Sequence, residues 1–262
     1  MKNKEILKAL VGSHNYGLNT PSSDRDYKIF VLPTFDDLYC GNMISTSSVK
    51  SDDQHEDKEV KDIRLLMELL RKSNPAYLEI LYSIDVETAP VFADIWGLLL
   101  SHREDIIQNN LLNLFNACWG TMCEKAKSLR QKKFTQTNKK MFDKLGYDPK
   151  NLCHFFRMET LLESYLQGSF NNCFGKCLSL EVVDKSLLLD TKSGKLCLTD
   201  SYEELITNSL NSVAEMKKYF VNTDGERSRH KELFAEVNEK IKSLIKKDVC
   251  TRSLYYGVNS GI

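Results

Sequence analysis

The sequence lacks several features that would assign it at once to a class of protein. Its 36 basic and 36 acidic residues cancel, so no overall field draws the chain towards nucleic acid or an anionic membrane. Its apolar runs are too short to span a bilayer, and residues 1–11 lack the long apolar region of a signal peptide. It contains no internal repeat and no low-complexity tract. We therefore expect a soluble, cytoplasmic protein whose contacts with charged partners are local.

Cysteine is present, but not in a pattern typical of a metal or disulfide site. The eight cysteines include no Cys-x-x-Cys pair, and the closest spacings are Cys118 to Cys123 and Cys173 to Cys177. Neither spacing is that of a thiol-ligated zinc site. Scattered free or buried thiols in a reducing cytosol are the expected state.

The stretch with the clearest chemical pattern runs from residue 10 to residue 32. An apolar strand is followed by Gly12–Ser13, which turns the chain, and a second strand begins near Asp24 and Asp26. Side chains two residues apart lie on the same face of a strand, so both carboxylates would point towards the turn. Such carboxylates repel unless a cation lies between them, and Mg²⁺ takes oxygen ligands together with substrate phosphates. The pattern indicates metal-dependent phosphoryl or nucleotidyl transfer, although the same residues are also ordinary turn formers.

The longer pattern Gly-Ser-x-x-Tyr-Gly-Leu-x-Thr-x-x-Ser-Asp-x-Asp-Tyr over residues 12–27 resembles the signature of the DNA polymerase β-type nucleotidyltransferase superfamily. It is most similar to one branch, the predicted nucleotidyltransferases linked to RNA repair, which are common in bacteria and large phages. Two later stretches fit the same branch. One is residues 62–81, with Asn74–Pro75 and Glu79, and the other is residues 146–157, with the pattern Gly-Tyr-Asp-x-Lys-x-x-x-His-x-x-Arg.

The resemblance implies an enzyme that passes a nucleoside monophosphate from an NTP to an acceptor hydroxyl and releases pyrophosphate. Two Mg²⁺ ions, replaceable by Mn²⁺, are the implied cofactor, bridged by Asp24 and Asp26. An RNA end, such as that of a damaged tRNA, is the implied acceptor, in the host cytoplasm if the protein is phage-encoded. Two alternatives stay open: AMPylation of a protein in a toxin–antitoxin or phage-defence system, and a nucleotide-binding protein without catalysis.

The implied substrate-binding residues lie in two stretches. Gly12 and Ser13 would grip the terminal phosphates, because glycine lets backbone N–H groups approach closely. His14 and Tyr16 belong to the same motif, with His14 standing where the branch often has Arg. A basic column at helical spacing would reach the triphosphate from a later helix. Its members are Lys150, His154 and Arg157.

A third carboxylate is expected on the strand after the Asp-x-Asp pair. If residues 55–60 form that strand, His55, Asp57 and Glu59 share one face. The acidic pattern before a helix that begins Asp-Ile-Arg resembles the branch and favours Glu59 over Asp57 as metal ligand or base. A solvated, charged edge strand is the other interpretation. Glu79 is also open, as a catalytic group or as the buried partner of an arginine.

The expected fold class is α+β. A small mixed sheet would form a catalytic domain over residues 1–90, followed by a mainly helical substrate-binding domain over residues 91–262. Within the second part, short apolar runs around a glycine predict a hairpin over residues 179–199.

One local charge bias stands out in this neutral chain. Residues 125–140 contain seven basic side chains and no acidic one. Such a run is typical of a segment that holds an RNA backbone or a triphosphate. It is equally typical of an exposed helix and loop whose lysines reach into water.

Overall fold

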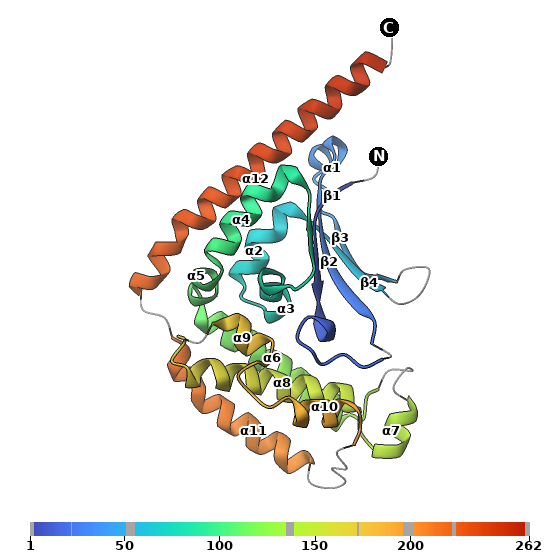
Figure 1. Ribbon diagram of the computed structural model, residues 1–262, viewed down its shortest axis with the longest axis vertical. Coiled ribbons are helices and arrows are strands. Elements are labelled where there is room, and N and C mark those ends of the chain that lie inside the picture. Colours follow the sequence, from blue (N-terminus) through green and yellow to red (C-terminus); the bar gives the residue numbers. More distant parts are fainter. Residues whose placement is uncertain are drawn as a thin grey trace.

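The computed structural model describes residues 3–21, 23–50, 56–134, 139–171, 173–195, 202–221 and 224–259, without the side chains of 47–50, 224–230 and 253–259. The predicted α+β class is confirmed. In these ranges a five-stranded mixed sheet is followed by a mostly helical region (Figure 1). None of the described helices is long and apolar enough to cross a membrane.

The sheet brings distant parts of the sequence together at one end. Its strands are β1 (Lys4–Val11), β2 (Arg25–Leu32), β3 (Ser45–Lys50), β4 (Glu56–Asp62) and β5 (Val86–Thr88), in the order β3-β4-β2-β1-β5. β2 and β4 are parallel, and the other neighbours are antiparallel. The register places Val11 opposite Asp26 and Asp26 opposite Asp57. The end of β1 and the starts of β2 and β4 therefore meet.

Alternation along β2 separates two faces of the sheet. Phe30 joins the main core, whereas Ile29 and Val31 belong to a smaller apolar cluster on the other face. Asp26 and Lys28 have the same parity as Phe30, so they share the face that the helices cover. Asp26 thus lies at one end of the sheet face that carries the main core.

Helices from the middle of the chain cover that face, and the C-terminal helix α12 packs on their outer side (Figure 1). Figure 1 shows α12 running along α4 and past it towards the C-terminus, and α12 also contacts α2. Asn74 caps α3, and Pro75 stands at its first position, where proline is favoured. The elements of this layer are η2 (Ile63–Leu65), α2 (Leu66–Arg71), α3 (Pro75–Leu78), η3 (Glu79–Tyr82), η4 (Pro90–Phe92), α4 (Ala93–Ser101) and α12 (Asp224–Asn259).

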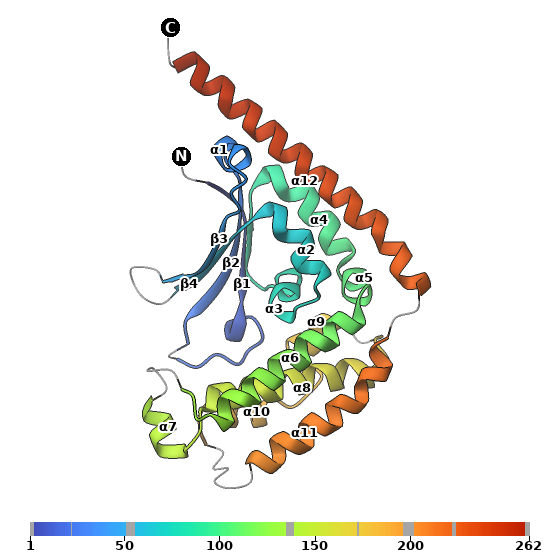
Figure 2. The same ribbon diagram turned by 180° about the vertical axis from the view of Figure 1, so that it is seen from behind.

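A second group of helices lies across the site end of the sheet (Figure 2). α6 and α8 pack against each other there, with α10 and α11 beside them. One continuous core runs from β1 through α6 and α8 to α12, and the expected boundary at residue 90 stays a prediction. The group comprises α5 (Arg103–Gln108), α6 (Leu111–Arg130), α7 (Lys139–Leu145), α8 (Pro149–Gln167), α9 (Phe174–Leu178), α10 (Ser186–Lys192), α11 (Tyr202–Met216) and η6 (Lys217–Phe220).

The predicted hairpin over residues 179–199 is wrong in its described part. Helix α10 occupies Ser186–Lys192 instead, and residues 196–199 lie outside the described ranges. Leu188 and Thr191 are buried one helical turn apart, and α10 packs against α8. Periodicity leaves the secondary structure of such a short apolar run ambiguous, and packing on a neighbouring helix determines it here.

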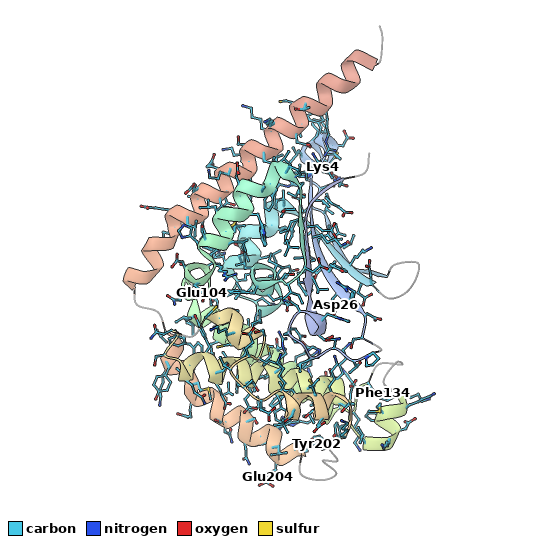
Figure 3. The ribbon with its side chains drawn as sticks, viewed as in Figure 1. Lys4, Asp26, Glu104, Phe134, Tyr202 and Glu204 are labelled. Carbon is cyan, nitrogen blue, oxygen red and sulfur yellow. The ribbon has the colours of Figure 1, made fainter. Side chains whose placement is uncertain are left out.

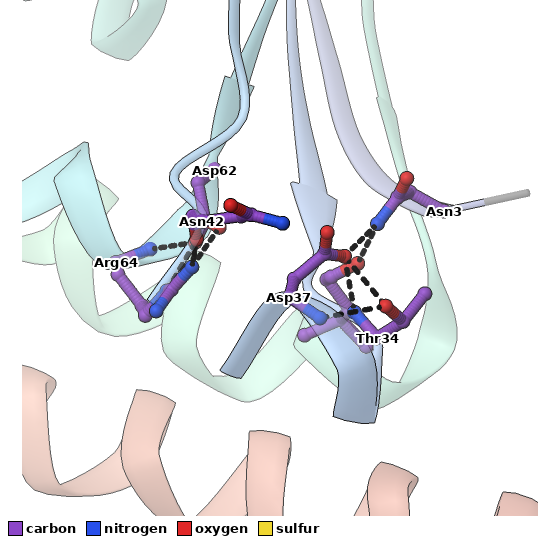
Figure 4. Close-up of polar contacts among 7 residues, drawn as sticks. Asn3, Thr34, Asp37, Asn42, Asp62 and Arg64 are labelled. Atoms are coloured by element: carbon purple, nitrogen blue, oxygen red, sulfur yellow. Dashed lines mark hydrogen bonds and ion pairs between the residues drawn. The ribbon is translucent and has the colours of Figure 1, made fainter. Parts of the chain in front are cut away.

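At the opposite end of the sheet, polar contacts fix the connections that follow β2 and β4. Thr34 and Asp37 form the capping box of α1 (Phe35–Tyr39). Asp62 is fully buried and accepts hydrogen bonds from Arg64 N at 2.9 Å, Nε at 3.0 Å and Nη2 at 2.7 Å (Figure 4). The Asp-Ile-Arg part of the motif is therefore occupied in joining β4 to η2.

Candidate active site

The turn after β1 packs directly on a carboxylate. Gly12 opens the short turn η1 (Gly12–His14) with a left-handed φ of +75°. A Cβ at this position would overlap the carboxylate of Asp26, so only glycine allows the approach. The Gly12 N–H, expected to face a phosphate, instead donates to both carboxylate oxygens of Glu79 at 3.4 Å. Gly12 is therefore held by hydrogen bonds to Glu79 and packs closely against Asp26.

Asp26 lies beside this turn, at the end of the sheet that faces the second group of helices (Figure 3). Asp24 and Asp57 lie within electrostatic reach of it. Burial raises the pKa of Asp26, and Asp57 and Asp24 raise it further against the opposing charges of Lys150 and His14. Within the described part of the chain, no three potential ligands are close enough together to hold a metal ion as they stand. Their donor chemistry, hard oxygens whose charges repel, nevertheless fits Mg²⁺.

Glu59 lies two residues after Asp57 on β4, and it is the register partner of Lys28 on β2. The two form an ion pair in which Lys28 is almost fully buried. Glu59 also accepts from the Tyr77 hydroxyl at 2.7 Å and pairs with Lys61 at 3.1 Å. Burial alone would raise the pKa of Glu59, but these partners hold it at about 2. The carboxylate is therefore engaged in a structural cluster. His55, on the same expected face, lies outside the described residues.

Glu79 is the buried partner of an arginine, one of the two roles its sequence position allows. Glu79 and Arg157 are 4% and 7% exposed, and a guanidinium nitrogen lies 3.9 Å from the carboxylate. Burial raises the pKa of Glu79 to about 7, although Arg157 opposes the shift. The guanidinium also lies over the ring of Tyr16, 3.5 Å from its centroid. Arg157 and Tyr16 therefore face inward, behind the Gly12 turn.

Lys150 and His154 lie on successive turns of α8, and Lys150 lies within electrostatic reach of Asp26. Burial and the charges of Arg157 and Lys150 lower the pKa of His154 to about 3, so its ring is neutral near pH 7. Lys125 of α6 and Lys192 of α10 add to the positive surroundings. The hairpin predicted for residues 179–199 gives no reason to place Lys192 beside α8, whereas the observed helix α10 does. Reading the same apolar run at helical spacing would have placed Lys192 beside α8.

Ser13 and His14 complete the motif on the loop that leads to Asp24. The Ser13 carbonyl accepts from Leu18 N at 2.9 Å. His14 Nε2 lies 3.0 Å from the carbonyl oxygen of Ser23, so the ring donates there. Both residues are partly exposed, unlike the buried Tyr16.

The sheet and the carboxylates at its end lie in the part of the chain that is similar to proteins of the DNA polymerase β type. Residues 2–115 match the model of the family described as "RNA repair pathway DNA polymerase beta family". The branch indicated by the motifs is thereby confirmed for the part of the chain that carries the sheet and the carboxylates.

A phage protein shares part of this similarity. The chain is 25% identical over 116 residues to the "Uncharacterized 38.9 kDa protein in nrdC-mobD intergenic region" of Enterobacteria phage T4. The alignment covers 41% of this chain and 34% of the phage protein, so the chain spans about a third of that relative's length.

Proposed function

We propose that this protein transfers a nucleoside monophosphate from an NTP to the terminal hydroxyl of an RNA, with release of pyrophosphate. The observation that carries the proposal is the meeting of the Gly12–Ser13 turn with Asp26 and Asp57 at one end of the sheet. The family match supports the reaction class. The RNA acceptor rests on the printed description of that family.

The carboxylates Asp24, Asp26 and Asp57 would hold the Mg²⁺ ions. Bound there, Mg²⁺ supplies positive charge for the polyphosphate and acidifies the acceptor hydroxyl. The order expected from sequence, Glu59 ahead of Asp57, is reversed in this proposal. Asp57 lies opposite Asp26, whereas Glu59 is occupied by Lys28.

The remaining residues divide into those that reach substrate and those that support the turn. Ser13, His14 and Lys150 are the groups we assign to the phosphates, since they are partly exposed or charged beside Asp26. The acceptor oxygen attacks the α-phosphorus, and the bond to the bridging oxygen breaks. Pyrophosphate leaves with that electron pair, and the acceptor proton passes to solvent. The supporting residues are Gly12, Tyr16, Glu79, His154 and Arg157.

The test is a screen of the four NTPs with total RNA for pyrophosphate release, with Mg²⁺ and with EDTA. Release that depends on Mg²⁺ and on RNA, with label from the NTP recovered in RNA, is the expected result. Label recovered in a polypeptide after incubation with host lysate would replace the RNA acceptor by a protein. Tight NTP binding without pyrophosphate over hours would overturn the enzymatic proposal.

Gly12→Ala is expected to cost far more than Gly41→Ala. Both glycines have left-handed backbones, with φ of +75° and +69°, so both variants lose about 1–2 kcal/mol of backbone stability. Only at Gly12 does the added methyl group meet the Asp26 carboxylate, because no atom lies within 4 Å of the corresponding position at Gly41. Gly12→Ala should therefore also lose pyrophosphate release. Thermal melts and turnover of the two variants decide this, and equal losses in both would show that the close approach to Asp26 has no role.

The exposed lysines beyond α6 are expected to contact RNA and not the NTP. Arg130 is paired with Glu203 at 3.1 Å, whereas Lys132 and Lys133 are exposed. Replacing both lysines by Ala should lower the salt slope of RNA binding by about one or two units, at roughly 0.7 per phosphate contact. The KM for NTP should not change.

RNA titrations at several salt concentrations measure this slope. The matched control replaces Lys246 and Lys247, an exposed lysine pair on α12, by Ala. A slope unchanged from wild type, or a weakened NTP affinity in its place, would contradict an RNA role for residues 132–133.

A further inference from the structure

The loop between the Gly-Ser turn and the aspartates packs on helices outside the family match. Its apolar side chains Tyr16 and Leu18 are 4% and 1% exposed. They do not join the main core. They form a separate cluster with Cys153 of α8, Leu180 after α9 and Leu188 of α10. The loop is therefore covered by residues 153–188, beyond the region of residues 2–115 that matches the family.

Three cationic side chains from the same helical region contact this loop. Lys192 Nζ donates to the Leu18 carbonyl at 2.6 Å, and Lys185 Nζ donates to the Tyr16 carbonyl at 3.5 Å. Arg157 lies over the Tyr16 ring. We call Arg157, Lys185 and Lys192 the loop clamp. Each of its members touches the loop between the two ends that carry the site.

The hydrogen bonds within the loop are local. Asn15 N donates to Gly12 O, Leu18 N to Ser13 O and Ser23 N to Thr20 O, each at 2.9 Å. Apart from the clamp lysines, Ile84 N also donates to Asn15 Oδ1 at 3.0 Å from outside the loop. A segment with few long-range hydrogen bonds opens at a lower free energy. Since the loop begins at the turn and ends at Asp24, opening of its middle would displace both ends of the site. External contacts to its carbonyls oppose that opening.

The clamp lysines contribute charge as well as hydrogen bonds. Lys192 lies within electrostatic reach of Asp26, since burial lowers the pKa of Lys192 while Cys153 and Asp26 oppose the shift. Lys192 Nζ is also 3.4 Å from Ser23 Oγ, one residue before the first aspartate. A cation here favours the ionised carboxylates that a metal ion requires.

We propose that Lys185 and Lys192 are positioning residues that hold the catalytic loop from α10, with Arg157 holding it from α8. The consequence for turnover rests on the proposed nucleotidyl transfer, but the positioning itself does not. The helical region would then be part of the active site's construction, in addition to any contact with substrate.

Lys192→Met tests the proposal, because it keeps the aliphatic stem and removes the donor and the charge. Hydrogen exchange at the amides of Asn15, Leu18 and Ser23 should become at least about tenfold faster, while amides within α8 and α10 keep their wild-type rates. Lys192→Arg should restore the wild-type rates. Lys195→Met is the matched control, since Lys195 follows α10, is 75% exposed and pairs only with Asp190 among the described residues.

Turnover gives a second measurement of the same variants. Lys192→Met should lower kcat about 10- to 100-fold, the usual loss when an outer support of a metal site is removed, with a smaller change in KM for the NTP. Loop exchange equal to wild type would overturn the clamp, and so would faster exchange spread equally over α10. If wild-type protein releases no pyrophosphate with any NTP, the proposed function fails while the exchange rates still decide the clamp.

Discussion

Asp26→Asn should abolish pyrophosphate release and leave the protein folded. The loss should exceed the roughly 10- to 100-fold cost of removing an outer partner of a metal site, because we place this carboxylate on the metal itself. Folding should not suffer, since burial and the neighbouring Asp57 and Asp24 disfavour the ionised form of Asp26. In metal-free buffer the melting temperature of the variant should equal or exceed that of wild type.

The pH dependence of this difference has a defined sign. The folded state raises the pKa of Asp26, so the native protein binds more protons there than the unfolded chain. Wild-type stability from this group is present at low pH and is lost as pH rises through the raised pKa. The stability of Asp26→Asn relative to wild type should therefore increase from about pH 4 upwards. Thermal melts across pH measure it. The exposed Asp36→Asn on α1 serves as the control, and substantial turnover in Asp26→Asn would exclude our site assignment.

Local chemistry made part of the fold predictable. In the sequence, the apolar run that ends before Pro33 predicts a strand over residues 25–32, and β2 is observed at Arg25–Leu32. Thr34 as a cap and Pro75 at a first helical position likewise predict the observed starts of α1 and α3. These features depend on residues within one turn or one strand of each other. The pattern of a single segment is enough to specify them.

Contacts between distant segments were not predictable in this way. Periodicity places Asp57 and Glu59 on the same face and cannot choose between them. The choice depends on the parallel register of β2 and β4, in which paired residues are 31 positions apart in the sequence. Likewise, the sequence allows two roles for Glu79, and only its proximity to Arg157 of α8 in the fold identifies it as the partner of an arginine.

The wrong hairpin shows a second limit. A short apolar run next to a glycine fits a strand and a helix equally well, and only the packing on α8 selects the helix. Because α10 carries Lys192, the error also hid a residue beside the site.

Asp57→Asn is expected to lose turnover, whereas Glu59→Gln is expected to lose stability. Asp57→Asn should lose turnover as severely as Asp26→Asn, with a melting temperature close to wild type. Glu59→Gln should instead lose stability, because Lys28 is 8% exposed and would keep its charge without a compensating carboxylate. The cost should be roughly 3 kcal/mol, the low end for breaking a buried pair, since Glu59 is itself partly exposed. For a chain of this length that lowers the melting temperature by roughly 6–12 °C.

Melts and initial rates of both variants, measured well below their transitions, separate the two roles. The folded state lowers the pKa of Glu59 to about 2, so its contribution is present above the ordinary carboxyl pKa and is lost as pH falls towards 2. The stability gap between wild type and Glu59→Gln should close over that range. Glu56→Gln is the control on the same strand, because its pair with Lys58 at 2.8 Å is a surface contact worth about 1 kcal/mol or less. A folded Glu59→Gln without turnover, beside an active Asp57→Asn, would return the third metal position to Glu59.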